Sequence, residues 1–187
     1  MMRKLKLQMQ ISLDGFVSGI NGNEAGFSWD DESKDYSIKN LEDVDNVLLG
    51  RKVAVDFIPY WRAAGEKPGN PEYLFGKTVS EIAPIIFSNT LKPSEAHGAE
   101  ILSGDIVEEV NKLKNRDGKS ILVYGGAGFV SSLIKHGLID EYHFLVNPVA
   151  LGNGLPIFNA LDNNLQLKLV TSKQLGSGTV VQCYEKI

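Results

Sequence analysis

The stretch that most constrains the fold of this chain is residues 120–158, where a short apolar run, several glycines, a helical pattern and a second apolar run follow one another. Residues 120–124 are rich in β-branched and aromatic types and predict a buried strand, as do residues 142–146. The glycines within 125–128 lie where the first strand would turn into the helix. Such a turn brings backbone N–H groups and a helix N-terminus to one point, which suits an anion such as a pyrophosphate. Taken alone, glycines at this place are also typical of ordinary turns.

Short apolar runs alternate with helical patterns through the rest of the chain. The first run, Leu5 to Leu13, alternates with polar residues and predicts a strand with one apolar face. Two alternating runs near the C-terminus, 165–175 and 179–184, would form a hairpin. The sequence therefore predicts a single α/β domain, residues 1–187, with a mostly parallel sheet, helices on both faces and a C-terminal antiparallel hairpin. The remaining predicted elements are strands at 45–49, 85–87 and 99–102, helices at about 30–40, 53–58, 73–83 and 105–115, and an irregular segment at 59–71.

Composition and charge exclude several classes of protein. Hydrophobic residues make up 43% of the 187 residues, enough for a sizeable core, and a net charge of −4 without a basic cluster argues against a nucleic-acid surface. No apolar run approaches the roughly 18 residues of a membrane span, and the N-terminus lacks the continuous apolar region of a signal peptide. One cysteine, Cys183, excludes an internal disulfide, and no Cys/His cluster has metal-ligand spacing. These features favour a cytoplasmic location.

Three predicted strands end in residues suited to phosphate or ribose. These residues are Gly50-Arg51-Lys52, Ser88-Asn89-Thr90 and the glycines within 125–128. In open α/β sheets, ligands bind beyond the carboxyl ends of the strands. Cations at the start of a helix oppose its macrodipole, a cost that a bound anion would offset; without an anion, Arg51 and Lys52 would simply point to solvent. Together the three strand ends indicate an extended ligand that carries several phosphates.

Two further features could border a ligand. Gln8 and Gln10 lie on the polar face of the first predicted strand, where they would either face solvent or offer neutral hydrogen-bonding groups to a polar ligand. The loop at 16–30 contains three glycines together with Phe27 and Trp29. Such a loop is typical of a mobile lid over a site, although a plain surface loop attached to the core through its tryptophan would have the same pattern.

Several motifs along the chain form a set that resembles the dihydrofolate reductase-like superfamily. Within it, the closer likeness is to the reductase domain of the bifunctional riboflavin-biosynthesis deaminase–reductase, the RibD C-terminal type. The resemblance covers nearly the full chain and implies a three-layer α/β/α fold of the dihydrofolate reductase type. Its carriers are Ser12-Leu13-Asp14-Gly15, Leu49-Gly50-Arg51-Lys52, Val123-Tyr124-Gly125-Gly126-Ala127-Gly128, Leu138-Ile139-Asp140-Glu141, and Pro148 followed by Leu151-Gly152-Asn153-Gly154.

The resemblance implies NADPH as the cofactor and assigns residues to both halves of a site. In this family the paired glycines often carry a cis peptide. The substrate pocket would include Gln10, Trp29, Phe57 and Trp61. The cofactor would be bound by Val17 near the nicotinamide, by Gly50, Arg51 and Lys52 at the phosphates, by Ser88, Asn89 and Thr90 at the adenosine end, and by Gly125, Gly126, Ala127, Gly128 and Phe129 at the pyrophosphate.

Three positions depart from the pattern of the family. Folate-reducing members place an acid on the helix after the lid tryptophan, whereas Lys34 stands at about that spacing here. Riboflavin reductases usually have a lysine where this chain has Gln8, and an acid where it has Tyr124. The resemblance therefore implies the cofactor half of the site more fully than the substrate half.

On this resemblance we expect an NADPH-dependent reductase that transfers hydride to a small heterocycle of pyrimidine or pteridine type, related to 5-amino-6-(5-phosphoribosylamino)uracil reductase. The sequence does not identify the proton donor: water, Asp14 and Tyr124 are candidates, although Asp14 also fits a turn-capping role. Two alternatives stay open: a nucleotide-binding module without turnover, which the missing acid and lysine favour, and a true dihydrofolate reductase. The resemblance also implies a homodimer, for which the alternating strands near the C-terminus would offer a surface.

Overall fold

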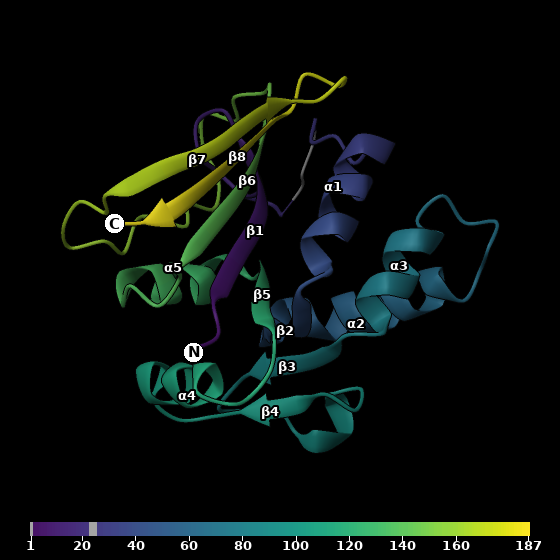
Figure 1. Ribbon diagram of the computed structural model, residues 1–187, viewed down its shortest axis with the longest axis vertical. Helices are drawn as coiled ribbons and strands as arrows, with labels where there is room; N and C mark the ends of the chain where they lie inside the picture. Colours follow the sequence, from purple (N-terminus) through teal and green to yellow (C-terminus); the bar gives the residue numbers. More distant parts are fainter. Residues whose placement is uncertain (1, 23–25) are drawn as a thin grey trace.

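The computed structural model describes residues 2–22 and 26–187, so residues 23–25 of the predicted lid loop 16–30 lie outside the described residues. It contains one eight-stranded sheet with strand order β4-β3-β2-β5-β1-β6-β8-β7 (Figure 1). Strands β1 to β6 run parallel to their neighbours, β8 pairs antiparallel with β6, and β7 pairs antiparallel with β8. The predicted α/β fold with its C-terminal antiparallel hairpin is therefore confirmed. The strands are β1 (Leu5–Ser12), β2 (Val44–Gly50), β3 (Ala83–Phe87), β4 (Glu100–Leu102), β5 (Ser120–Gly125), β6 (Glu141–Asn147), β7 (Leu167–Gln174) and β8 (Val180–Lys186).

Helices cover both faces of the sheet, and each face has its own hydrophobic cluster. Helices α4 and α5 lie on one face, where Leu133 packs with Leu7 of β1; α1, α2 and α3 lie on the other, where Phe75 packs with Leu49 of β2 (Figure 1). No helix among the described residues has the length and apolar character needed to cross a bilayer. The helices are α1 (Asp31–Leu41), α2 (Arg51–Gly65), α3 (Tyr73–Ser80), α4 (Ile106–Lys114) and α5 (Ala127–Lys135), with a short 3₁₀ helix, η1, at Pro93–Glu95.

Helix α2 continues through Pro59, so the irregular segment predicted for residues 59–71 is wrong over its first half. A proline inside a helix removes one backbone hydrogen bond, to the carbonyl four residues earlier. Pro59 and Val55, which carries that carbonyl, both lie on the exposed side of the helix, where water can replace the lost donor. The helix therefore extends to Gly65 and carries Tyr60 and Trp61 on a regular element.

Helices α2 and α3 approach each other closely at two glycines. A Cβ atom on Gly76 would lie 2.8 Å from the backbone nitrogen of Gly65, and a Cβ on Gly65 would lie 2.6 Å from the backbone nitrogen of Lys77. Only glycine permits such contact between backbones. The connection between the two helices, which contains Glu72, is thereby held against α2.

A buried polar layer lies between α1 and the sheet. Gln8 donates from Nε2 to Ser37 Oγ at 2.7 Å and accepts at Oε1 from Asn40 Nδ2 at 2.8 Å. On the neighbouring strand β6, His143 is in register with Gln8, and its Nδ1 atom is 2.5 Å from the hydroxyl of Tyr36. Of the two interpretations of the polar face of β1, solvent exposure is wrong for Gln8, because the residue is buried and α1 hydrogen-bonds its amide.

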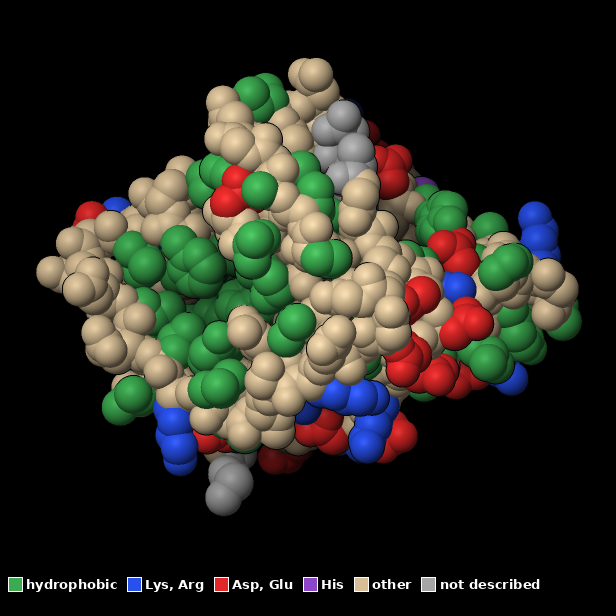
Figure 2. Space-filling view, turned by 90° about the horizontal axis from the view of Figure 1, so that it is seen from above, with side chains coloured by type: hydrophobic (Ala, Val, Ile, Leu, Met, Phe, Trp, Pro, Cys, Tyr) green, Lys and Arg blue, Asp and Glu red, His purple; other side chains and the backbone are tan. Residues whose placement is uncertain are grey.

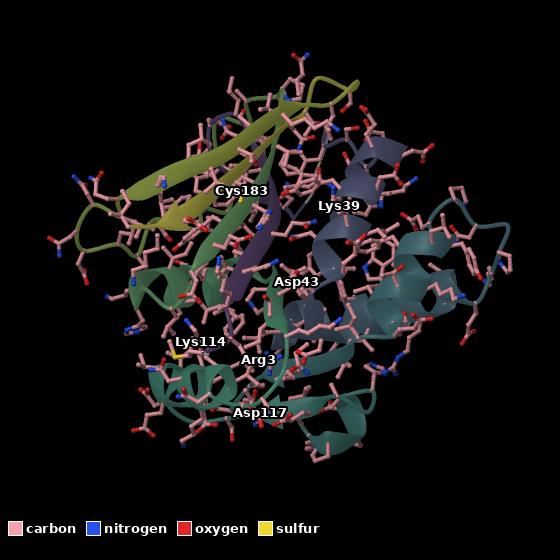
Figure 3. All side chains as sticks on the ribbon, viewed as in Figure 1. Arg3, Lys39, Asp43, Lys114, Asp117 and Cys183 are labelled. Atoms are coloured by element: carbon pink, nitrogen blue, oxygen red, sulfur yellow. The ribbon has the colours of Figure 1, made fainter. Side chains whose placement is uncertain are left out.

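Buried cations gather at the amino ends of the parallel strands. Lys114 pairs with Asp140 at 2.6 Å, and Arg3 forms an ion pair with Asp45 and donates to Asn46 Oδ1 at 2.7 Å. Figure 3 shows Arg3 and Lys114 beside the start of β1 and the end of α4. These pairs stabilise the fold at the edge of the sheet opposite to the carboxyl ends of the strands.

Candidate functional site

Two helices begin side by side at the carboxyl ends of β2 and β5. These strands are neighbours, with Leu49 in register with Gly125. Gly50 caps α2 and Gly126 caps α5, and neither residue offers a side chain to the free N–H groups of the first turn. The positive ends of two helix dipoles therefore meet at one edge of the sheet, where they favour an anion.

The space around these helix starts has room for an anion. A Cβ on Gly128 would meet nothing within 4 Å, so the first turn of α5 is open to a ligand. A Cβ on Gly50 would lie 2.9 Å from Cβ of Phe129, so glycine at position 50 lets the two helix starts touch. The described residues contain no cis peptide bond, which corrects the cis peptide that the resemblance implies; Gly125 instead adopts a φ of 144°.

Arg51 and Lys52 add positive charge to the same edge. Both side chains are exposed, and α2 has no acidic residue in its first turn. Neither cation forms an ion pair with any of the residues that the structure describes. Two cations at a helix N-terminus without a counter-charge fit the phosphates of a dinucleotide.

The turn after β3 lies at the same edge, because β3 pairs with β2. Ser88 is buried, and its Oγ accepts from the backbone N–H groups of Thr90 at 3.2 Å and Leu91 at 3.0 Å. Asn89 Oδ1 accepts from the N–H of Gly104 at 2.7 Å. The side chains of Ser88 and Asn89 therefore hold the turn together, and Thr90 is exposed beside them. Contact of these three residues with a cofactor stays a prediction.

An aromatic cavity of about 370 Å³ adjoins this edge. Phe57 stacks on Tyr124 with ring centroids 5.6 Å apart, and Trp61 packs edge-on against Phe75 at 4.6 Å. The size is within the range of small-molecule sites. The structure places the four predicted substrate residues, Gln10, Trp29, Phe57 and Trp61, in its lining, together with Gln8, Met9, Val17, Phe27, Tyr60, Glu72, Phe75 and Tyr124.

The cavity and the glycine-lined edge share a wall. Met9 lines the cavity, and its Cε atom would lie 3.8 Å from a Cβ on Gly125. Val17, the residue predicted to lie near the nicotinamide, also lines the cavity. A ligand that follows the edge would therefore reach the cavity at its inner end.

Glu72 is a residue of this cavity that the sequence did not reveal. It precedes α3, and the hydroxyl of Tyr60 donates a hydrogen bond to its Oε2 atom. Nothing in its local spacing distinguishes it from a surface acid, and the resemblance directs attention to an acid on α1 instead.

Gln10 also lines the cavity, from the polar face of β1. Its Oε1 accepts from Asn147 Nδ2 at 3.1 Å.

Asp14 has the geometry of a loop-closing residue. Its carboxylate accepts from the backbone N–H groups of Leu151 at 3.0 Å and Gly152 at 2.7 Å, and from Ser12 Oγ at 2.6 Å. These hydrogen bonds, that of Ser12 first, lower the pKa of Asp14 to about 2. The carboxylate is therefore ionised at neutral pH and has no proton to give, which supports the turn-capping interpretation.

Tyr124 forms part of the cavity wall with its ring. Its hydroxyl is buried without a hydrogen-bond partner among the described residues, as is the indole N–H of Trp29. Burial raises the pKa of Tyr124 well above its usual range. Both polar groups are therefore enclosed by the wall, and Tyr124 keeps its proton at neutral pH.

A separate group, Glu141, His143 and Cys183, lies in the polar layer under α1, with its potential ligand atoms within 4.8 Å of one another. Glu141 Oε1 is 2.5 Å from Nε2 of His143, and Lys4 and Lys6 also pair with this carboxylate. The hydrogen bond to His143 is the main cause that lowers the pKa of Glu141 to about 2. The acid is thus satisfied by neighbouring side chains of the protein interior.

Comparison with known proteins identifies relatives over nearly the whole chain. The family described as the RibD C-terminal domain matches residues 3–181. The Bacillus subtilis (strain 168) protein YyaP, described as uncharacterized, is 33% identical over 97% of this chain and 94% of its own length. The crystal structure of a putative riboflavin biosynthesis protein from Shewanella sp. PV-4 shares the fold with a TM-score of 0.72 and 19% identity, over 98% of this chain and 99% of the other. Dihydrofolate reductase from Enterococcus faecalis, complexed with NADP(H), superposes with a TM-score of 0.61 and 14% identity, over 98% and 96% of the two chains.

Proposed function

The chain belongs to the RibD C-terminal domain family, and on that premise we propose that it is an NADPH-dependent reductase of a small pyrimidine- or pteridine-like heterocycle. One observation carries the proposal. Two uncapped helix N-termini and the exposed cations Arg51 and Lys52 converge at one sheet edge, directly beside an aromatic cavity. The same fold holds NADP(H) in the dihydrofolate reductase of Enterococcus faecalis. A cytoplasmic location is part of the proposal, since one buried cysteine fits a reducing compartment.

The glycine-lined edge would bind the cofactor, and the aromatic cavity would bind the substrate. The N–H groups at the starts of α2 and α5, with Arg51 and Lys52, would hold the cofactor phosphates, and Val17 and Met9 would border its reactive end. NADPH, when bound, supplies the hydride for the reduction. The aromatic side chains of the cavity would orient the substrate ring and exclude water. The protein thus contributes position and surroundings, and the proton comes from a donor other than the ionised Asp14.

A titration tests the cofactor and the reaction separately. Trp29 and Trp61 lie in the cavity wall, so their fluorescence should report NADPH binding at micromolar concentration. Loss of NADPH absorbance in the presence of pyrimidine or pteridine compounds would then show turnover. Failure to bind NADPH would overturn both the cofactor and the enzyme. Binding without turnover of any such compound would favour the alternative of a nucleotide-binding module, and turnover of dihydrofolate would favour a true dihydrofolate reductase.

We also propose that two copies associate through the β7 side of the sheet. Strand β7 is the edge strand, and nearly all its residues are exposed, including Leu169 and Val170. Figure 2 shows hydrophobic side chains gathered in a hollow on the side of the molecule that carries β7, β8 and α5. An exposed edge with apolar side chains favours pairing with another chain. Light scattering on the native protein and on Leu169→Lys tests this: a native dimer that the substitution dissociates is expected, and a native monomer would refute it.

A further inference from the structure

The cavity has an unusual balance of charge for a site that would accept a phosphorylated substrate. Glu72 is the one charged residue among the described residues that line it, and the rest are aromatic, aliphatic or amide side chains. A phosphate placed there would meet a carboxylate and no cation. Lys52 lines a separate hollow that shares Phe57 and Tyr60 with the cavity, and the proposed cofactor phosphates account for that cation.

Glu72 is held in a defined position although it lies in a connection between helices. Its backbone N–H donates to Asn70 Oδ1 at 2.8 Å, and its Oε2 atom accepts from the hydroxyl of Tyr60. No lysine, arginine or histidine within residues 2–22 and 26–187 forms an ion pair with it. The second oxygen, Oε1, has no hydrogen-bond donor from the described residues. This half-buried carboxylate is therefore positioned through one oxygen, and its other oxygen is open to a ligand.

The continued helix α2 explains why this arrangement exists. Tyr60 follows Pro59 on α2, and the close contact of Gly65 with Gly76 brings the α2–α3 connection against the same helix. Tyr60 also packs edge-on against Trp61 with ring centroids 5.0 Å apart, which restricts the position of its hydroxyl. The hydrogen-bond donor thus comes from α2, and the acid is the N-cap residue of α3, the helix that packs against α2 at Gly76.

The chemistry of this wall selects a class of ligand. Aromatic side chains favour a flat ring, and a carboxylate with an unused oxygen favours N–H donors on that ring. Gln10 Nε2 has no partner among the described residues and can donate to a ring acceptor. An acid beside an aromatic wall rejects a phosphate by charge repulsion and by the cost of removing both anions from water.

We propose that the substrate is a planar, phosphate-free ring with N–H donors, and that Glu72, held by Tyr60, is the residue that selects it. This inference rests on the proposed function only in taking the aromatic cavity as the substrate site. It assigns to Glu72 the role of the acid for which Lys34 stands at the corresponding place on α1. It also separates this chain from a reductase of a phosphoribosyl compound, the type that the family resemblance implies.

Binding to the protein without cofactor tests the inference through two pairs of probes. Diaminopyrimidine has the N–H donors that dimethoxypyrimidine lacks, and uridine lacks the phosphate that uridine monophosphate carries. By calorimetry we expect diaminopyrimidine to bind about tenfold or more tighter than dimethoxypyrimidine, the effect of a hydrogen bond to a charged group. Uridine should bind tighter than uridine monophosphate. Equal affinities within the first pair, tighter binding of the phosphate, or no binding of diaminopyrimidine would each overturn the inference.

Variants connect the selectivity to the two residues. Glu72→Gln should weaken diaminopyrimidine about tenfold or more and leave dimethoxypyrimidine nearly unchanged, and Tyr60→Phe should weaken diaminopyrimidine less. Glu66→Gln, at an exposed acid at the end of α2, is the matched control and should leave both affinities unchanged. Thermal unfolding checks that each variant is folded. An unchanged affinity in a folded Glu72→Gln protein would refute the role of Glu72.

NADPH titrations of the same proteins distinguish this inference from the proposed function. Glu72→Gln should bind NADPH as the native protein does, because neither Arg51 nor Lys52 lines the cavity and neither forms an ion pair with Glu72. If the native protein binds diaminopyrimidine through Glu72 but does not bind NADPH, the ligand class stands and the reductase fails. If NADPH binds and the probes show no dependence on Glu72, the ligand class fails and the cofactor assignment stands.

Discussion

The glycine-lined edge and the aromatic cavity are adjacent, yet they are assembled in different ways. The edge is formed by short continuous runs of sequence, at residues 50–52 and 125–129, which follow directly from two neighbouring strands. The cavity collects side chains from β1, the loop after it, α2, the α2–α3 connection, α3 and β5. A continuous run can be recognised in a sequence because it directly follows a predicted strand. In a parallel sheet the carboxyl ends of neighbouring strands lie together, so the runs that follow them lie together as well. A cavity built from six parts of the chain depends on how the helices pack.

Because the cavity wall consists of side chains packed between several elements, we expect substitutions there to affect both the stability of the fold and the binding of a ring-shaped ligand. Phe75 is 2% exposed and packs against Trp29, Trp61 and Tyr124. Phe75→Ala should lower the free energy of unfolding by about 3–5 kcal/mol, because it leaves a cavity in the cluster under α3. Urea denaturation measures the loss. Leu74→Ala, on the exposed side of the same helix, should change stability by no more than about 0.5 kcal/mol; similar losses in both variants would contradict the packing argument.

The edge contains one position where packing and binding coincide. In Gly50→Ala the new methyl group would lie 2.9 Å from Cβ of Phe129, so the starts of α2 and α5 must separate. We expect a loss of about 1–3 kcal/mol in stability together with weaker NADPH binding. Gly69→Ala, where a methyl group would meet nothing within 4 Å, is the control and should leave both unchanged. Native affinity and stability in Gly50→Ala would show that the two helix starts need not touch.

Charge at the edge should matter for binding but not for folding. Arg51→Ala combined with Lys52→Ala should weaken NADPH by about tenfold to a hundredfold, the effect of one or two charge-assisted hydrogen bonds, and should weaken NADH less. Stability should stay within about 0.5 kcal/mol of the native value, because both side chains are exposed. Fluorescence titration with NADPH and with NADH measures the loss of affinity for each cofactor. Equal losses for NADPH and NADH would count against a contact with the 2′-phosphate.

Glu141 in the polar layer under α1 should affect neither the edge nor the cavity, only stability at low pH. The folded-state pKa of Glu141, about 2, is lower than its ordinary value of 4.5, so its contribution is complete above about pH 4.5 and is lost as the pH falls towards 2. We expect a loss of about 2 kcal/mol over that window, with a smaller pH dependence in Glu141→Gln. Asp14 titrates over the same range, so the pH profile of Asp14→Asn separates its part of the pH dependence from that of Glu141. An unchanged pH profile in Glu141→Gln would show that the hydrogen bond to His143 adds no net stability.

Individual residues show how far the sequence could lead. Gln8 and Gln10 stand two positions apart on one face of β1, and no local pattern separates them. Gln8 is hydrogen-bonded to Ser37 and Asn40 of α1, whereas Gln10 lies where α1 no longer covers the strand and borders the cavity. Ser88 and Asn89 have the chemistry of a ribose contact, which stays a prediction, and the folded chain adds that their side-chain oxygens hold a turn together.

The sequence by itself determined the order of strands and helices, the parallel sheet with its C-terminal hairpin, and the glycines and cations at the strand ends. These features are local, because periodicity and turn chemistry act over a few residues. Tertiary structure alone decided that α2 passes through Pro59, that α3 packs on it at Gly65 and Gly76, and that Glu72 thereby enters the aromatic cavity. The contact of Gly65 with Gly76 depends on how two helices pack, and no local sequence pattern predicts it. The position of Glu72 in the cavity could therefore be found only in the folded chain.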